Sequence, residues 1–225
     1  MSERLVPLVL DEYYHIYNRG NSKQEIFKNN SDYARFMQLL YLSNGTKSFK
    51  VRDLGAQDPY EVDMGDKLIA IGAYCLMPNH FHILARPLVE GGMTTFMKKL
   101  GTGYSGYFNK KYGRTGGLFE GKFKSQHADS DEYLKYLFSY IHLNPVKLIQ
   151  SDWKEQGIKD KAGASAYLKK YPWSSYLDLI PTGRSCVERR ELGILGSLHF
   201  PDYFKAQQTI DEELSEWLKY VHNVD

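Results

Sequence analysis

The chain has 225 residues, of which 42% are hydrophobic, enough for one sizeable core or for one domain with an extension. A net charge of +2 does not by itself indicate a strongly charged partner. The two cysteines, Cys75 and Cys186, exclude a disulfide framework and a zinc-ribbon spacing. No stretch approaches the roughly 20 apolar residues of a membrane span, and the first residues lack the apolar run of a signal peptide. We therefore expect a soluble, cytoplasmic protein without membrane contact.

The first half of the chain carries the signals of an antiparallel sheet. A strand is predicted over residues 12–18, where Tyr and Ile are good strand formers, and a turn over 18–21. A helix is predicted from Ser31 to about Gly45, and one strand near 49–52. The clearest signal is a pair of apolar runs, 67–76 and 80–87, whose short connection predicts a hairpin.

The second half alternates helices with a further strand. A helix is predicted over 94–112 and a strand over 118–125. Another helix begins at Asp129 or Ser130, with capping-box spacing between Asp129 and Glu132, and ends before Pro145. Beyond residue 150 the composition changes: Trp153 and segment 171–176 predict aromatic anchors, and helices are predicted over 186–195 and 211–221. This order of elements is typical of an α+β fold built on an antiparallel sheet.

Two histidines on the second strand of the hairpin are candidate metal ligands. Residues two apart in a strand point to the same face, so His80 and His82 present their imidazoles side by side, while Phe81 and Ile83 point into apolar packing. Neutral imidazoles on one face can begin a metal site. Surface or core histidines fit the same pattern, so the pair alone leaves both interpretations open.

The helix before Pro145 carries a tyrosine and an asparagine on one face. Tyr140 and Asn144 lie four residues apart, so the amide oxygen of Asn144 can serve as a third ligand to a hard cation with the phenol one turn away. A core tyrosine and a helix-capping asparagine are the alternative interpretation. Tyr133 and Tyr136 share this helical surface and are local rivals of Tyr140 as a nucleophile.

A basic stretch lies between these two motifs. Residues 98–125 contain seven basic side chains and a single acid, Glu120, which is the charge pattern that a phosphate backbone requires. A solvated helix face fits the same excess equally well. Glu120 can orient a metal ligand or a base. Lys122 and Lys124 alternate with phenylalanines, so this segment predicts either a nucleic-acid groove or an edge strand protected by lysines.

Five segments in this order together resemble the single-tyrosine HUH transposases, most closely the transposases associated with repetitive extragenic palindromes. The segments cover residues 14–21, 77–84, 117–125, 140–147 and 171–176. The resemblance runs over roughly residues 10–180, whereas the loop over 45–66 and the tail from about Arg184 depart from the pattern. It implies a ferredoxin-like or RNA-recognition-like palm, with a central antiparallel sheet flanked by helices and a helical C-terminal extension. We expect a catalytic domain over residues 1–150 and an extension over 151–225.

The resemblance also implies an activity. Tyr140 corresponds to the nucleophile that cuts hairpin-containing single-stranded DNA and holds the 5′ end as a phosphotyrosine, and His80, His82 and Asn144 correspond to the ligands of Mg²⁺ or Mn²⁺. Glu120 and His142 are candidate supporting residues, although His142 is expected to point elsewhere on the helix. The protein would act on the nucleoid as a monomer or a homodimer. The predicted DNA contacts are basic residues: Arg19, Lys98, Lys99, Lys110, Lys111, Arg114, Lys122 and Lys124.

Three alternatives are weaker. A two-histidine iron oxygenase needs a carboxylate ligand, for which Glu120 is the nearby candidate, and leaves Tyr140 and the basic stretch without a role. A palm-like nucleic-acid-binding module, or a transposase that has lost strand transfer, is distinguished by the absence of a covalent DNA adduct. A rolling-circle initiator or relaxase is less consistent with the small size and the single motif tyrosine.

Overall fold

The computed structural model describes residues 7–179, 193–205 and 210–221. Four strands form one antiparallel sheet in the order β2-β3-β1-β4. Their bounds are Tyr13–Arg19 for β1, Ile69–Met77 for β2, His80–Pro87 for β3 and Lys124–Ala128 for β4. The sheet is flanked by helices, so the fold is the predicted α+β palm.

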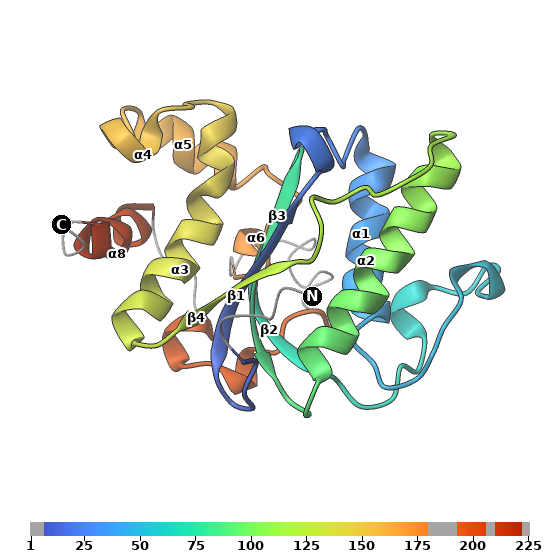
Figure 1. Cartoon of the computed structure of the whole chain (residues 1–225). Helices are drawn as coiled ribbons and strands as arrows, with labels where there is room; N and C mark the ends of the chain where they lie inside the picture. The colour runs from blue at the N-terminus through green and yellow to red at the C-terminus, as the bar shows by residue number, and fades with distance from the viewer. Residues whose placement is uncertain (1–6, 180–192, 206–209, 222–225) are drawn as a thin grey trace.

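Helices cover both faces of the sheet (Figure 1). Helices α1 (Asn30–Leu42) and α2 (Gly92–Lys111) lie on one face, and α3 (Asp131–Leu143) lies on the other. The shorter helices and turns have the following bounds: η1 Asn21–Lys23, η2 Val51–Asp53, η3 Pro59–Glu61, η4 Asn144–Leu148, α4 Trp153–Gln156, α5 Lys161–Leu168, α6 Tyr176–Leu179, η5 Ser197–His199, η6 Asp202–Lys205 and α8 Ile210–Val221. None of the helices within the described ranges combines the length and the apolarity needed to span a bilayer.

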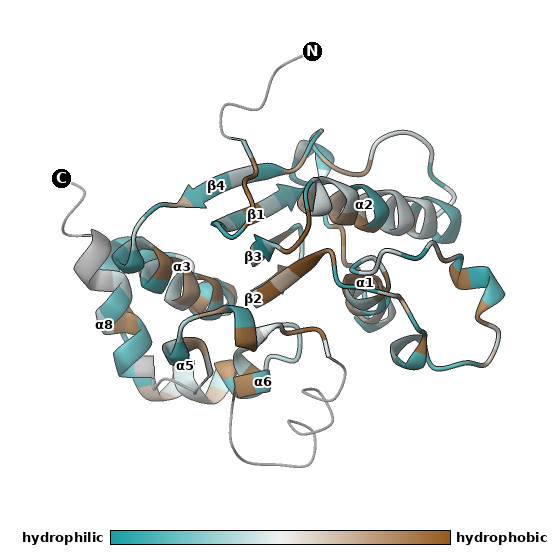
Figure 2. Ribbon diagram, turned by 90° about the horizontal axis from the view of Figure 1, so that it is seen from below, coloured by the Kyte–Doolittle hydropathy of each residue, from teal (hydrophilic) through white to brown (hydrophobic). Residues whose placement is uncertain are grey.

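Strand alternation divides the core into two layers. Ile16, Phe81 and Ile83 pack with α1 and α2, whereas Leu84 packs with α3 on the opposite face. β2 is buried along its whole length and is coloured as hydrophobic over most of it in Figure 2. A third cluster, which includes Trp153 and Trp217, joins the end of α3 to the C-terminal helices.

The free edge of β2 is covered by segments that follow α3. Cys75 forms a bridge with Ser174, and Ile71 forms one with Leu195. Trp173 also stacks on Tyr33, with ring centroids 4.8 Å apart. Because an uncovered strand edge invites pairing with another chain, these contacts protect the sheet as well as attach the later segments.

Several predicted boundaries are wrong in informative ways. Residues 118–123 are not part of β4, because Phe119 pairs only with Gly20 before the chain bends at Gly121. Ser130, not Asp129, caps α3: its hydroxyl accepts a hydrogen bond from the backbone N–H of Tyr133, so the predicted capping box is absent. Residues 51–53 form a turn of 3₁₀-helix rather than a strand.

The remaining boundaries agree closely with the predictions. α3 ends at Leu143 and the chain continues as 3₁₀-helix through Pro145. α1 begins one residue before Ser31, and α2 begins two residues before its predicted start. In the hairpin, β2 begins two residues later than predicted, and β3 has the predicted bounds. The helix predicted over 211–221 corresponds to α8, whereas residues 186–192 of the other predicted C-terminal helix lie outside the described residues, and residues 193–195 are not helical.

Candidate active site

The two predicted histidines lie on the face of the sheet that carries α3. His80 and His82 project from β3 toward that face, and Phe81 and Ile83 pack into the opposite core, as the alternation predicts. His82 is buried and His80 is half-buried. His80 Nδ1 lies 2.6 Å from the side-chain oxygen of Asn79. The Nδ1–H therefore donates to Asn79, and the other ring nitrogen of neutral His80 keeps its lone pair.

A third histidine orients His82 from the neighbouring strand. His15 on β1 places Nε2 2.8 Å from His82 Nδ1, and the two rings are stacked. His82 Nε2 is buried and has no hydrogen-bond partner among the described residues. When His82 Nδ1 carries the proton and donates it to His15, Nε2 presents a free lone pair to the cavity. The sequence did not single out His15, although it shares a face of β1 with Tyr17, the register partner of His82.

Helix α3 brings Tyr140 and Asn144 over the two histidines. The Tyr140 ring meets the His82 ring edge-on, with centroids 5.4 Å apart. Asn144 is buried and lines the same cavity as His80 and His82. Its Nδ2 has no partner within the part of the chain that the structure describes. The four residues that sequence patterns singled out thus line one cavity: His80 and His82 from β3, Tyr140 from α3, and Asn144 from the position after α3.

A lysine from beyond residue 150 completes the contacts of Tyr140. Lys154 in α4 donates a hydrogen bond from Nζ to Tyr140 Oη, 2.8 Å away, and its Nζ also lies 4.2 Å from the centroid of the Tyr140 ring. An ammonium group at this distance stabilises negative charge on the phenolic oxygen. No sequence motif indicated Lys154, because only the fold brings α4 against α3.

Burial keeps the histidines of the site neutral. Desolvation lowers the pKa of His15 to about 3 and the pKa of His80 to about 4, with further lowering from Lys154 and Lys147 respectively. Desolvation also lowers the pKa of His82 well below its usual value, assisted by His15. Neutral imidazoles are the form that ligates metals, so these groups are in the ligating form well below neutral pH.

The cavity in front of these groups measures about 850 Å³. Five basic side chains line it, against the two acids Glu25 and Glu120. Glu120 is engaged by Arg19, whose guanidinium nitrogens lie 3.1 and 3.0 Å from the two carboxylate oxygens, and this contact lowers the pKa of the carboxyl group. The lining is therefore net positive and suited to a polyanion. Its basic residues are Arg19, Lys23, Lys124, Lys147 and Lys154.

The donor set fits a divalent cation. The candidate ligands are two imidazole nitrogens and the amide oxygen of Asn144, all neutral and all lining the cavity. His82 Nε2 is a buried nitrogen whose lone pair has no other use among the described residues. No three residues among His, Cys, Asp and Glu form a metal-binding group in the described ranges, so an amide is needed as the third ligand. Such neutral nitrogen and oxygen ligands bind Mg²⁺ or Mn²⁺ less tightly than a set of carboxylates does, and they leave the positive charge of the cation unneutralised.

Other predicted residues lie away from this site. His142 is fully buried on the far side of α3, between Ser175 Oγ at 3.0 Å and Glu213 Oε1 at 3.1 Å. His142 therefore helps to hold α8 against α3 and does not line the active-site cavity. Among the predicted DNA contacts, Arg19 and Lys124 line the cavity, whereas Lys98 and Lys122 line a second groove and Lys99 and Lys110 a third.

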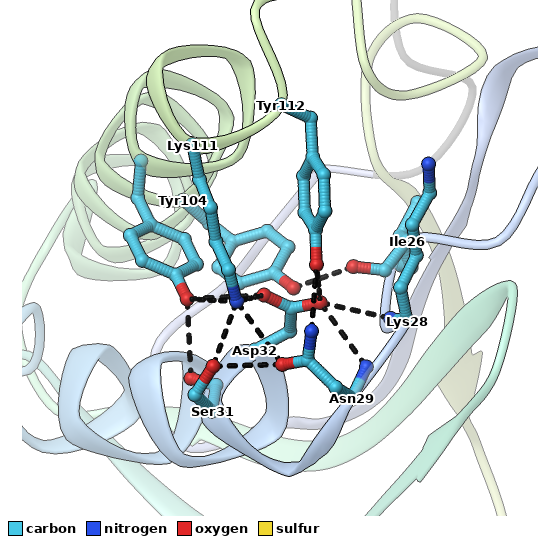
Figure 3. Close-up of polar contacts among 9 residues, drawn as sticks. Ile26, Lys28, Asn29, Ser31, Asp32, Tyr104, Lys111 and Tyr112 are labelled. Atoms are coloured by element: carbon cyan, nitrogen blue, oxygen red, sulfur yellow. Dashed lines mark hydrogen bonds and ion pairs between the residues drawn. The ribbon is translucent and has the colours of Figure 1, made fainter.

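Lys111 is held in an internal network (Figure 3). Its Nζ lies 2.6 Å from Oδ1 of Asp32, a carboxylate with no exposed surface that also accepts a hydrogen bond from Tyr112. This ion pair joins α2 to the start of α1. Arg114 lies over the ring of Phe108 next to the same helix end. Both residues have structural contacts that the count of basic residues could not reveal.

Comparison with known families bears on residues 63–144. This segment matches the family model described as "Transposase IS200 like". The resemblance predicted from the sequence is confirmed over these residues. The matched segment of this transposase-like chain holds both histidines of β3, Tyr140 and Asn144, but ends before Lys154 and begins after His15.

One solved structure is similar over most of the chain. It is described as "Structure of the REP associates tyrosine transposase bound to a REP hairpin", and it shares 13% sequence identity, covers 93% of each chain and has a TM-score of 0.48. The curated proteins contain no match to this chain.

Proposed function

We propose that this protein cuts and rejoins single-stranded DNA through a covalent bond to Tyr140. The observation that carries the proposal is the convergence of Tyr140, His82 and Asn144 on one net-positive cavity, with Lys154 on the phenolic oxygen. These are the groups that an attack on a phosphodiester requires: a nucleophile, a means of holding a cation, and positive charge around the phosphate.

In the proposed reaction, Tyr140 Oη attacks the phosphorus atom of a DNA phosphodiester. A bond forms between Oη and phosphorus, and the bond from phosphorus to the 3′ oxygen breaks. The phenolic proton passes to water, and the departing 3′ oxygen takes a proton from water. The products are a 5′-phosphotyrosine and a free 3′-hydroxyl. Because the bond energy is kept in the phosphotyrosine, a second 3′-hydroxyl can reverse the attack and join strands.

Each residue has a distinct part in this scheme. Lys154 stabilises the developing charge on Tyr140 Oη, which is a poor nucleophile while protonated. His15 and Asn79 fix the rings of His82 and His80, so that these two residues and Asn144 can hold a divalent ion. A bound Mg²⁺ or Mn²⁺ would act as a Lewis acid on the non-bridging phosphate oxygens.

We further propose that residues 1–150 form the catalytic domain and residues 151–225 an extension that takes part in the site. Lys154 and Ser151, both in the extension, line the active-site cavity, which supports this division of labour. The substrate is single-stranded DNA beside a hairpin, and the protein meets it at the nucleoid. A groove lined with lysines and aromatic residues admits a single strand more easily than a duplex.

The test is formation of a covalent adduct. Purified protein is mixed with labelled hairpin DNA that carries single-stranded flanks, with Mg²⁺ or Mn²⁺, and the products are separated on a denaturing gel. A shifted band that requires the metal and is lost in Tyr140→Phe and His82→Ala supports the proposal. DNA binding without an adduct on any flank sequence would instead indicate a nucleic-acid-binding module.

A further inference from the structure

A second groove lies behind one wall of the active-site cavity. It has a volume of about 580 Å³ and is lined by α2, the end of β1 and residues 119–123. Asn18 lines both the groove and the active-site cavity. Its Nδ2 donates a hydrogen bond to the backbone oxygen of Gly121 at 3.2 Å, which ties the wall to β1.

The wall is formed by residues 119–124, which lie between the groove and the active-site cavity. Its residues that line the groove are Phe119, Gly121, Lys122 and Phe123, whereas Glu120 and Lys124 line the active-site cavity. Gly121 has φ +111°, a conformation that favours glycine, and this permits the bend between the two halves of the segment. A strand of DNA that leaves the active site therefore needs to cross only this one segment to reach the groove.

The lining of the groove matches the chemistry of a nucleotide. Phe36 and Phe81 are buried and form part of its apolar surface, and Phe119 and Phe123 are half-buried walls. Two exposed lysines, Lys98 and Lys122, line it too, and none of the carboxylates in the described part of the chain does. Aromatic faces stack on bases of any sequence, while ammonium groups contact the phosphates.

We propose that this groove binds one unpaired nucleobase of the single-stranded DNA flank, with its phosphates on Lys98 and Lys122. The inference rests on the proposed function, because it needs a single-stranded DNA substrate. A base within a duplex is covered on both faces by its neighbours and cannot enter. The groove thus selects an unpaired nucleotide at a fixed distance from the bond that Tyr140 attacks, and it would help to set where the strand is cut.

Two glycines of α2 allow a matched test. Gly101 lines the groove, and a Cβ atom added to it meets no atom within 4 Å. A Cβ atom added to Gly106 likewise meets none, but Gly106 lines a different groove together with Phe49 and Lys110. Leucine is a better helix former than glycine at both positions. Gly101→Leu blocks the proposed base site, and Gly106→Leu is its control.

The experiment measures affinity for hairpin DNA in a Tyr140→Phe background, with each flanking nucleotide replaced in turn by an abasic one. With Gly101 intact, one abasic position is expected to weaken binding by roughly 5- to 150-fold, the loss of one stacked base. Gly101→Leu should weaken binding of intact DNA by a similar factor and abolish the further effect of that abasic position. Gly106→Leu should leave both values unchanged.

The outcomes separate this inference from the proposed function. If the abasic effect persists in Gly101→Leu, or is lost instead in Gly106→Leu, the base is bound elsewhere and the inference is wrong, while adduct formation by Tyr140 is unaffected. Phe123→Ala gives a second reading without adding volume to α2, and the same loss of the abasic effect is expected. If hairpin DNA does not bind at all, both proposals are refuted.

Discussion

Lys154→Met tests whether the ammonium group beside Tyr140 takes part in the chemistry. The variant keeps most of the side-chain length and removes the charge and the 2.8 Å hydrogen bond to Tyr140 Oη. A hydrogen bond that involves a charged group contributes about 1.5–3 kcal/mol. Lys154 is half-buried, so screening by water reduces this value, and we take the lower half of the range. Because each 1.36 kcal/mol corresponds to a factor of ten in rate, the variant should form the adduct about 10- to 40-fold more slowly.

The assay is the single-turnover rate of covalent adduct formation at saturating DNA and metal. The matched control is Lys147→Met, which removes another lysine from the same cavity wall. We expect Lys147→Met to weaken DNA binding with little change in the saturated rate, and Lys154→Met to lower that rate. Lys154→Arg should restore part of it, because a guanidinium also donates hydrogen bonds. Equal rate losses in both Met variants, or an effect of Lys154→Met on affinity alone, would refute the assigned role.

Four further predictions follow from the same contacts. His15→Leu should lower the affinity for Mn²⁺ about 10- to 100-fold, because His82 loses the partner that fixes its ring. The affinity is measured from the metal dependence of adduct formation, and an unchanged metal dependence would contradict the role of His15. Asp32→Ala should lower the free energy of unfolding in urea by about 1–3 kcal/mol, because the backbone N–H of Lys28 and the hydroxyl of Tyr112 lose their buried acceptor, whereas the exposed ammonium group of Lys111 can turn to water. In Lys111→Met, the salt dependence of DNA binding should match that of the unaltered protein; a slope lower by about one would mean that Lys111 contacts phosphate. In EDTA, the free energy of unfolding should fall as the pH drops from about 6.5 toward 4, by up to about 1.4 kcal/mol per pH unit for each of His15 and His80. The reason is that both histidines stay neutral in the folded protein and take up protons on unfolding. Urea midpoints that do not change between pH 7.5 and 5 would contradict the lowering of the two pKa values.

Alternation and helical spacing predicted the centre of the candidate site because both are local rules. The period of two placed His80 and His82 on one face, and the four-residue offset placed Tyr140 of α3 beside Asn144, the C-cap of that helix. The hairpin and the main helices were predictable for the same reason. The spacing of residues does not predict that α3 packs over β3. That arrangement was predicted only from the family resemblance.

The contacts that depend on tertiary structure were not predictable from local patterns. Lys154 reaches Tyr140 only because α4 packs against the end of α3, and His15 reaches His82 only through the register of β1 against β3. For the same reason, the roles of the individual lysines in the basic stretch could not be predicted from the sequence. Lys111 and Lys122 are alike in sequence, yet one neutralises a buried aspartate and the other lies exposed at a groove.

The most direct test of the account is to identify the residue that becomes bonded to DNA. The adduct is digested with nuclease and protease, and the peptides are sequenced by mass spectrometry. Tyr133 and Tyr136 stack on the same side of α3 as Tyr140, with ring centroids less than 6 Å apart from one to the next, so they are the natural internal comparison. The account predicts a nucleotide mass on Tyr140 alone, formed only with a divalent metal. A nucleotide on Tyr136 or Tyr133, or an adduct that forms equally well in EDTA, would contradict it.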